Sequence, residues 1–203
     1  MDPDRATRRL FVALEPTDAV RRRIRAAQGE LRRAAGRAEG DIRWVAPESV
    51  HLTLQFLGAV PEERVAAVGE AMAEAARAAP GPLSLEVRGA GGFPNARRPR
   101  VVWLGVGGDL ATLRALVLDL GRRLAPLGFP PEDRPFAGHL TLGRAREGRG
   151  NPGIAGALAG AREEEAVAWR ASEMVLFESH LSPKGARYEA VARAPLGAAG
   201  RTA

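Results

Sequence analysis

The tetrapeptide HLTL stands at residues 51–54 and again at residues 139–142, about half a chain apart. Successive side chains of a β-strand point to opposite faces, so in each copy the histidine and the threonine share one face and the two leucines share the other. The leucines can therefore anchor in a core while a rigid strand holds the polar pair on an open face. One such motif is usually structural, but two copies in a chain with three histidines favour a functional pair.

Two histidines and two threonines held in this way suit chemistry at phosphorus. If an approximate two-fold axis relates the copies, His51 and His139 lie on opposite sides of one cleft, with Thr53 and Thr141 between them. In-line displacement needs a base on the attacking oxygen, an acid on the leaving oxygen and donors on the non-bridging oxygens. Histidine, with an ordinary pKa of about 6.5, can take either proton role near neutral pH. We therefore predict an acid/base pair and two phosphate-binding hydroxyls, with no metal ion required.

The elements around the two motifs follow a similar order in both halves of the chain. In the first half we expect strands at residues 9–14, 42–45 and 51–57, a helix from Thr17 or Asp18 to about residue 36, and a helix at residues 61–79. In the second half we expect strands at residues 83–87, 101–106 and 139–142, a helix at residues 109–126, and final strands at residues 173–178 and 188–191. The repetition predicts two related lobes within a single bilobal domain over residues 1–203.

The composition narrows the class of protein. A chain of 203 residues can bury an ordinary core, and the absence of cysteine excludes disulfides, thiolate metal sites and a cysteine nucleophile. The net charge of +6 and the pI near 11.1 favour a polyanionic partner, although a GC-rich genome would give the same arginine bias. The apolar stretch at residues 10–14 is too short for a signal peptide or a membrane span. We expect a cytoplasmic protein with no membrane association.

Weaker sequence patterns mark other residues as candidates for substrate binding or metal binding. Arg144 and Phe11 are taken as substrate-binding candidates, but Arg144 falls on the opposite face of an ideal strand from the second motif's polar pair, so its access needs a twist or the strand's end. Phe11 is either a core residue or an aromatic that stacks on a base. His180 is expected in an exposed loop, and a zinc site on the three histidines lacks a recognisable fourth ligand. The basic loops at residues 93–100 and 145–153 are either solvated surface or RNA contacts.

Beyond the two motifs, five segments carry a family resemblance over nearly the whole chain. They are RLFVALEP at residues 9–16, RWVAPESVHLTLQFLG at 43–58, PRVVWLGV at 99–106, FAGHLTLGR at 136–144 and GARYEAVARAPL at 185–196. In this order they resemble the two-histidine (2H) phosphoesterase superfamily and, within it, the RNA 2',3'-cyclic phosphodiesterases also called 2'-5' RNA ligases. One departure is Ala137-Gly138, where the family has an arginine or proline and then a proline, and it affects strand entry more than chemistry.

The resemblance implies an α+β fold class: a bilobal 2H phosphoesterase fold with two antiparallel sheets facing a central cleft, helices outside, and lobes related by a pseudo-two-fold axis. It implies hydrolysis of RNA 2',3'-cyclic phosphate ends to 2'-phosphomonoesters without a cofactor. In that reaction His51 resembles the proton donor to the 3' oxygen and His139 the proton acceptor that activates water. Thr53 and Thr141 resemble the phosphate-binding threonines. The resemblance also implies reversible, ATP-independent 2'-5' RNA ligation.

The expected partner is an RNA that ends in a 2',3'-cyclic phosphate, with tRNA fragments among the candidates, because such an end can form only where a 2' hydroxyl exists. We expect the chain to act as a monomer. Two alternatives stay open: a cyclic phosphodiesterase for a small nucleotide, and a non-catalytic RNA-end-binding protein whose histidines only hold the phosphate. The salt dependence of activity on long RNA, compared with that on a cyclic mononucleotide, distinguishes the first alternative from the main hypothesis. Binding of RNA ends without turnover would identify the second.

Overall fold

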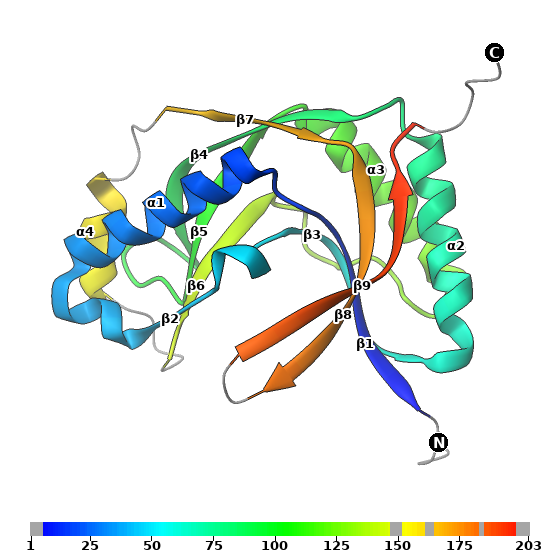
Figure 1. Ribbon diagram of the computed structural model, residues 1–203, viewed down its shortest axis with the longest axis horizontal. Helices are drawn as coiled ribbons and strands as arrows, with labels where there is room; N and C mark the ends of the chain where they lie inside the picture. Colours follow the sequence, from blue (N-terminus) through cyan, green and yellow to red (C-terminus); the bar gives the residue numbers. More distant parts are fainter. Residues whose placement is uncertain (1–5, 147–151, 161–164, 183–184, 198–203) are drawn as a thin grey trace.

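The structure, a computed structural model, describes residues 6–146, 152–160, 165–182 and 185–197 and contains two antiparallel sheets (Figure 1). The first sheet has, in spatial order, β3 (Leu52–Pro61), β1 (Thr7–Leu14), β8 (Glu173–Ser182) and β9 (Gly185–Pro195). The second has β2 (Ile42–Trp44), β6 (His139–Ala145), β5 (Val101–Gly108), β4 (Leu83–Phe93) and β7 (Val167–Ala171). The predicted α+β class with two antiparallel sheets is confirmed.

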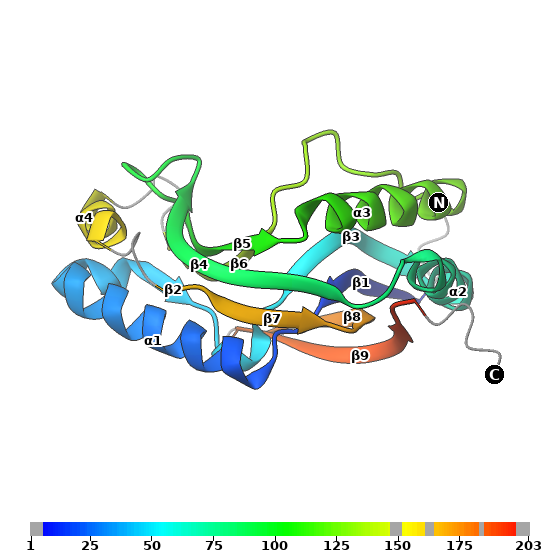
Figure 2. The same cartoon turned by 90° about the horizontal axis from the view of Figure 1, so that it is seen from above.

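The helices lie outside the sheets. They are α1 (Asp18–Ala35), α2 (Glu62–Ala78), α3 (Leu110–Leu124) and α4 (Pro152–Gly160), and short 3-10 helices lie at Gly36–Asp41, Pro47–Ser49 and Ala125–Leu127. Figures 1 and 2 place α1 beside α4 at one end of the molecule and α2 beside α3 at the other. In α1 the buried residues Val20, Ile24, Ala27 and Leu31 recur at the helical spacing of three or four, which turns one face toward the core. Within the described residues, no helix is long and apolar enough to cross a membrane.

Most elements lie where the sequence predicts them, but β3, β8 and β9 are longer than expected, and further differences concern β4, β7 and α4. Strand β4 continues beyond residue 87 to Phe93, and β7 was not among the expected strands. Helix α4 begins at Pro152, inside the segment predicted as a basic loop at residues 145–153, of which residues 147–151 lie outside the described part. Its glycine-rich sequence has low intrinsic helix propensity, but Ile154 and Leu158, one turn apart, are buried in the core.

Each sheet takes strands from both halves of the chain. The first sheet combines β1 and β3 with the last two strands, β8 and β9, while the second combines β2 with four later strands. Helix α1 starts after Thr17, whose side chain makes no capping hydrogen bond, and contacts α4 and β7. The two sheets therefore do not correspond to the two halves of the sequence.

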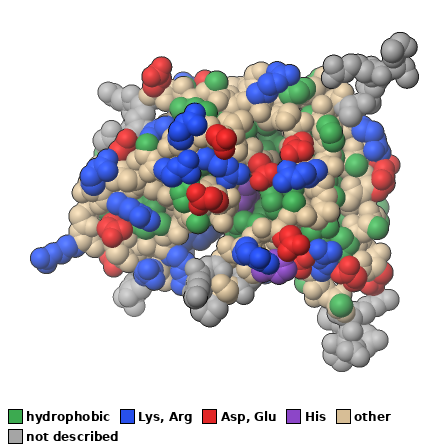
Figure 3. All heavy atoms as spheres, in the orientation of Figure 1, with side chains coloured by type: hydrophobic (Ala, Val, Ile, Leu, Met, Phe, Trp, Pro, Cys, Tyr) green, Lys and Arg blue, Asp and Glu red, His purple; other side chains and the backbone are tan. Residues whose placement is uncertain are grey.

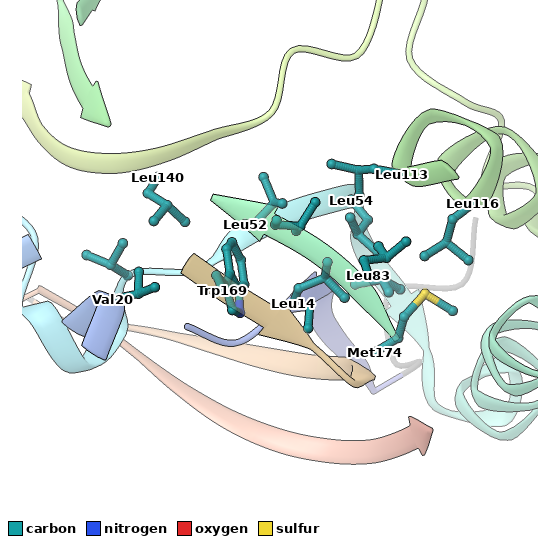
Figure 4. Close-up of a cluster of buried hydrophobic side chains, with 14 of the residues drawn as sticks. Leu14, Val20, Leu52, Leu54, Leu83, Leu113, Leu116, Leu140, Trp169 and Met174 are labelled. Atoms are coloured by element: carbon teal, nitrogen blue, oxygen red, sulfur yellow. The ribbon is translucent and has the colours of Figure 1, made fainter. Parts of the chain in front are cut away.

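The leucines of both HLTL copies lie in one core, as predicted. Leu52, Leu54, Leu140 and Leu142 are between 0% and 5% exposed and belong to a single hydrophobic cluster. Figure 4 shows three of them, Leu52, Leu54 and Leu140, in the core that also contains Trp169. Burying a leucine side chain stabilises a fold by about 1.5–3 kcal/mol, so these residues fix the position of both motifs.

Candidate active site

His51 occupies the position immediately before β3, packed among aromatic rings. Its ring stacks on Phe11, with centroids 4.6 Å apart, and meets Tyr188 edge-on at 5.0 Å. The Nδ1 atom lies 2.9 Å from the carbonyl oxygen of Ser49. Because a carbonyl can only accept a hydrogen bond, Nδ1 carries the proton, and in the neutral ring Nε2 is the nitrogen with a free lone pair. The aromatic contacts and the backbone contact together fix both the tautomer and the ring orientation.

His139, the first residue of β6, repeats this arrangement. Its Nδ1 atom lies 2.8 Å from the carbonyl oxygen of Ala137, again two residues earlier in the chain. Phe93 meets the ring edge-on at 5.0 Å, and the centroid of Trp103 is 6.5 Å away. Both copies of the motif therefore hold neutral histidine in the same tautomer by the same local contact.

The two motifs meet at one cleft. His51, Thr53, Thr141 and Arg144 all line a cavity of about 350 Å³, and β3 contacts β6. His139 lies close enough for its charge to lower the pKa of His51. The structure thus brings His51 and both threonines to one cleft, whereas His139 lines a neighbouring cavity, near enough to act on His51 through its charge.

A β-bulge in each motif strand determines which later residue reaches the cleft. In β6, Trp103 of β5 pairs with Thr141 while the preceding Val102 pairs with Gly143, so Leu142 is an extra residue. In β3, Ala13 of β1 pairs with Thr53 while Val12 pairs with Gln55, so an extra residue stands at the same point of the motif. A bulge reverses the alternation of faces beyond it.

This reversal explains Arg144. An ideal strand would turn its side chain away from the polar pair, but beyond the bulge Arg144 lines the cleft and its charge lowers the pKa of both histidines. The glycine before it is required by space, because a Cβ at Gly143 would lie 2.6 Å from Cγ2 of Ile42 on β2. The carbonyl of Leu142 also accepts a hydrogen bond from the buried Gln28 of α1, at 3.0 Å, which ties the bulge to the helix.

Phe56 holds the position in the first motif that Arg144 holds in the second, and the sequence analysis did not identify it. It follows the β3 bulge as Arg144 follows the β6 bulge, lines the same cleft and is 54% exposed. An exposed ring at the edge of a cleft offers a flat stacking surface for a base. Aligning the two motifs as HLTLQF and HLTLGR would have paired Phe56 with Arg144.

Phe11 has a different role from the base stacking considered above. It lines the cleft but is only 2% exposed, because the rings of His51, Phe177 and Tyr188 cover it. A ring covered in this way cannot stack on a ligand, so Phe11 supports His51 from behind.

Burial changes the proton affinity of both histidines. The pKa of His51 is lowered to about 4, mainly because burial disfavours the charged ring, while the Ser49 carbonyl opposes the shift and Arg144 adds to it. Burial also lowers the pKa of His139, and Arg144 again contributes. The ordinary pKa expected from the sequence therefore does not hold for these buried rings, and neutral imidazoles are favoured at pH 7. A bound phosphate anion would shift both pKa values upward.

The third histidine is separate from this site. His180 lies within β8, not in the expected loop, and its Nε2 is 3.6 Å from Glu189 and 3.8 Å from Glu178. No group of three or more His, Asp or Glu side chains in the described part of the chain is arranged to hold a metal ion. Trp44 and Trp169 also lie apart, one against Arg32 and the other in the core.

The charges are not gathered into one basic surface on the face that Figure 3 shows. Arginines and acidic side chains are interspersed there, in keeping with ion pairs such as Arg193 with Glu15 and Glu173. In the segment at residues 93–100, Asn95 accepts hydrogen bonds from the backbone N–H groups of Arg97 and Arg98, whose side chains are exposed. The net charge is therefore weaker support for binding to a long RNA than the composition alone suggested.

Comparison with known proteins shows similarity to phosphoesterases. Residues 14–103 and 108–188 match the family model described as LigT like Phosphoesterase. The chain is 36% identical over 183 residues to an RNA 2',3'-cyclic phosphodiesterase of Archaeoglobus fulgidus, covering 89% of this chain and 96% of that protein. Among solved structures, TT0787 of Thermus thermophilus superposes with a TM-score of 0.73 at 29% identity, covering 93% of this chain and 98% of that one. Escherichia coli LigT complexed with 3'-AMP gives a TM-score of 0.67 at 29% identity, covering 94% and 99%.

Proposed function

Since this chain belongs to the LigT-like phosphoesterase family, we propose that it hydrolyses RNA ends bearing a 2',3'-cyclic phosphate to 2'-phosphomonoesters. The observation that carries this proposal is the matched pair of imidazoles, each tied through Nδ1 to the carbonyl two residues earlier. Both rings therefore present Nε2 for chemistry. Two threonines and Arg144 lie in the same cleft to bind phosphate oxygens.

Hydrolysis would use the two imidazoles in opposite protonation states. Neutral His139 takes a proton from water through Nε2 as the water oxygen attacks phosphorus. The bond between phosphorus and O3' breaks, and protonated His51 gives its Nε2 proton to O3'. The hydroxyls of Thr53 and Thr141 and the guanidinium of Arg144 stabilise the charge on the non-bridging oxygens.

The lowered pKa of His51 links binding to this step. Burial disfavours the protonated ring, and the cationic Arg144 adds to this effect. A phosphodiester anion placed among these groups neutralises the arginine and favours the imidazolium. The substrate itself would therefore help to charge the proton donor, which keeps the acid inactive until the cleft is filled.

The proposed substrate is RNA, because the cyclic phosphate requires a 2' hydroxyl. The exposed ring of Phe56 and the side chain of Arg9 line the same cleft, where they can contact the terminal base and its neighbouring phosphate. If a 5' hydroxyl replaces water as the nucleophile, the same proton transfers join two RNA ends through a 2'-5' linkage without ATP.

The test is turnover of an RNA oligonucleotide ending in 2',3'-cyclic phosphate, with EDTA present and with the product identified. We expect a 2'-phosphate from wild type and loss of turnover in His51→Ala and His139→Ala. His180→Gln is the matched control, since it removes a histidine outside the cleft, and it should retain activity. RNA-end binding by wild type without turnover would instead identify a binding protein. Turnover of a cyclic mononucleotide that is as fast as that of RNA and insensitive to salt would indicate a small-nucleotide enzyme.

A further inference from the structure

The short 3-10 helix at Pro47–Ser49 contains the carbonyl that holds His51. It ends two residues before the histidine and contacts α1, beside which it is drawn as a cyan coil in Figure 1. A single turn of this length has little stability of its own, because forming a turn fixes several dihedral angles for one hydrogen bond. The position of the Ser49 carbonyl therefore depends on contacts that other elements make with the turn.

Arg21 of α1 supplies such contacts. Its Nη1 atom donates hydrogen bonds to the carbonyl oxygens of Glu48, at 2.9 Å, and Pro47, at 3.2 Å. The next carbonyl oxygen, that of Ser49, lies 2.9 Å from Nδ1 of His51. Side chains thus bind three successive carbonyls of one turn, two through the arginine and one through the histidine. An arginine is well suited to this place, since the last carbonyls of a helical turn lack partners within it.

The guanidinium of Arg21 is itself fixed from the other side. Its Nη2 atom lies 3.5 Å from Glu15, which directly follows β1. The second oxygen of Glu15 accepts a hydrogen bond from Arg193 of β9 at 2.7 Å, and Arg193 also donates to Glu173 of β8 at 2.6 Å. The Arg21 side chain is only 18% exposed. An isolated surface ion pair stabilises little, but a linked set of charges with one member mostly covered can hold a guanidinium in one orientation.

The second motif histidine is held without an arginine. The Ala137 carbonyl lies 2.8 Å from Nδ1 of His139. Among the residues that the structure describes, no arginine donates to this carbonyl or to that of Phe136. The arginine support is therefore a feature of the first motif, whose histidine is the proton donor in the proposed reaction.

We propose that Arg21 is a positioning residue that orients His51 as the proton donor, acting through the backbone of the turn at Pro47–Ser49. This inference rests on the proposed function, in which Nε2 of His51 must face O3'. The anchored Nδ1–H keeps the ring from turning and fixes the tautomer that remains after Nε2 has given its proton away. Because a misplacement of about 1 Å can lower a rate about 10²-fold, the turn should affect kcat more than substrate binding.

The kinetic test is hydrolysis of an RNA oligonucleotide ending in 2',3'-cyclic phosphate by Arg21→Met, which removes the donor and keeps an apolar stem. We expect kcat to fall at least about tenfold, with KM within about twofold of wild type. Arg21→Lys should recover most of the loss, because the single atom Nη1 binds both carbonyls and an ammonium group also offers several donors at one point. Arg25→Met is the matched control. Arg25 lies one turn further along α1 and contacts the Glu48 carboxylate, at 3.3 Å, instead of a backbone carbonyl, so kcat should not change.

A second measurement does not depend on activity. In NMR spectra that resolve the ring nitrogens at pH 7.5, wild type should carry the proton on Nδ1 of both His51 and His139. Arg21→Met should move only His51 toward a mixture of the two tautomers, and Arg25→Met should move neither ring. Urea unfolding establishes that each variant is folded, and Arg21→Lys is compared with wild type if Arg21→Met is not.

Four results would overturn the positioning role. They are an Arg21→Met variant with the kcat and the His51 tautomer of wild type, a loss in folded protein that Arg21→Lys does not reduce, an equal change in both histidines, and an effect on KM alone. The third would indicate a general structural role, and the fourth a direct contact with substrate. A wild type without hydrolysis, in which Arg21→Met still changes the His51 tautomer, would instead count against the proposed function, so the two failures are distinguishable.

Discussion

The buried imidazole of His51 should make the fold less stable as the pH falls. Its pKa is about 4 in the folded chain and about 6.5 in an unfolded chain. Between these values the unfolded state binds a proton that the folded state does not, so the free energy of unfolding decreases on acidification. The stability that the neutral, buried ring of His51 contributes is fully present above pH 6.5 and is lost as the pH approaches 4.

The size of the effect follows from the same two pKa values. A pH of 5 is about 1.5 units below the pKa of the ring in the unfolded chain, so that ring is mostly protonated. In the folded chain the ring is still mostly neutral at this pH. At 1.36 kcal/mol per unit, protonation of the unfolded state costs the fold about 2 kcal/mol at pH 5 and almost nothing at pH 7.5. Other groups also titrate in this range, so the contribution must be isolated by substitution.

The assay is urea unfolding at pH 7.5 and pH 5 for wild type and for His51→Gln, which lacks the titrating ring. We expect wild type to lose about 2 kcal/mol more than the variant between the two conditions. Thr53→Ser, which keeps the imidazole of His51 in the cleft, should follow wild type. An equal pH dependence in wild type and His51→Gln would refute the buried neutral imidazole. The ring's own NMR titration, expected near pH 4, gives a direct check.

Three further predictions concern activity. Above both histidine pKa values, kcat/KM should fall about tenfold per pH unit, because less of the free enzyme has a protonated His51; a flat profile from pH 6.5 to 8 would argue against this donor. Arg144→Ala should lower kcat roughly 10²–10³-fold and move the fall in kcat/KM to higher pH, since it removes one cause of the lowered pKa, and unchanged kinetics would exclude Arg144 from the site. Gln28→Leu, which leaves the Val45 carbonyl unpaired, should reduce the free energy of unfolding by about 1–3 kcal/mol and lower kcat through the β6 bulge; full activity would show that the bulge forms without it.

The local sequence pattern was sufficient to predict much of the fold of this protein. The alternation in HLTL predicted that Leu52 and Leu140 enter a core while His51 and His139 do not, because strand geometry depends only on the local backbone. The apolar periodicity of residues 18–36 likewise predicted α1. Helix α4 was missed because its local propensity is low and its stability depends on burial against α1 and β4.

The sequence by itself determined the proposed chemistry: it contains two histidines and two threonines in a repeated motif, and we propose that they act on a phosphate. Only the tertiary structure decided which other residues join them and in which protonation state. Arg144 and Phe56 reach the cleft because pairing with β5 and β1 inserts an extra residue into each motif strand, and that register depends on distant strands. The pKa of His51 falls because Phe11 and Tyr188, from β1 and β9, exclude water from a ring that the sequence alone would place in solvent.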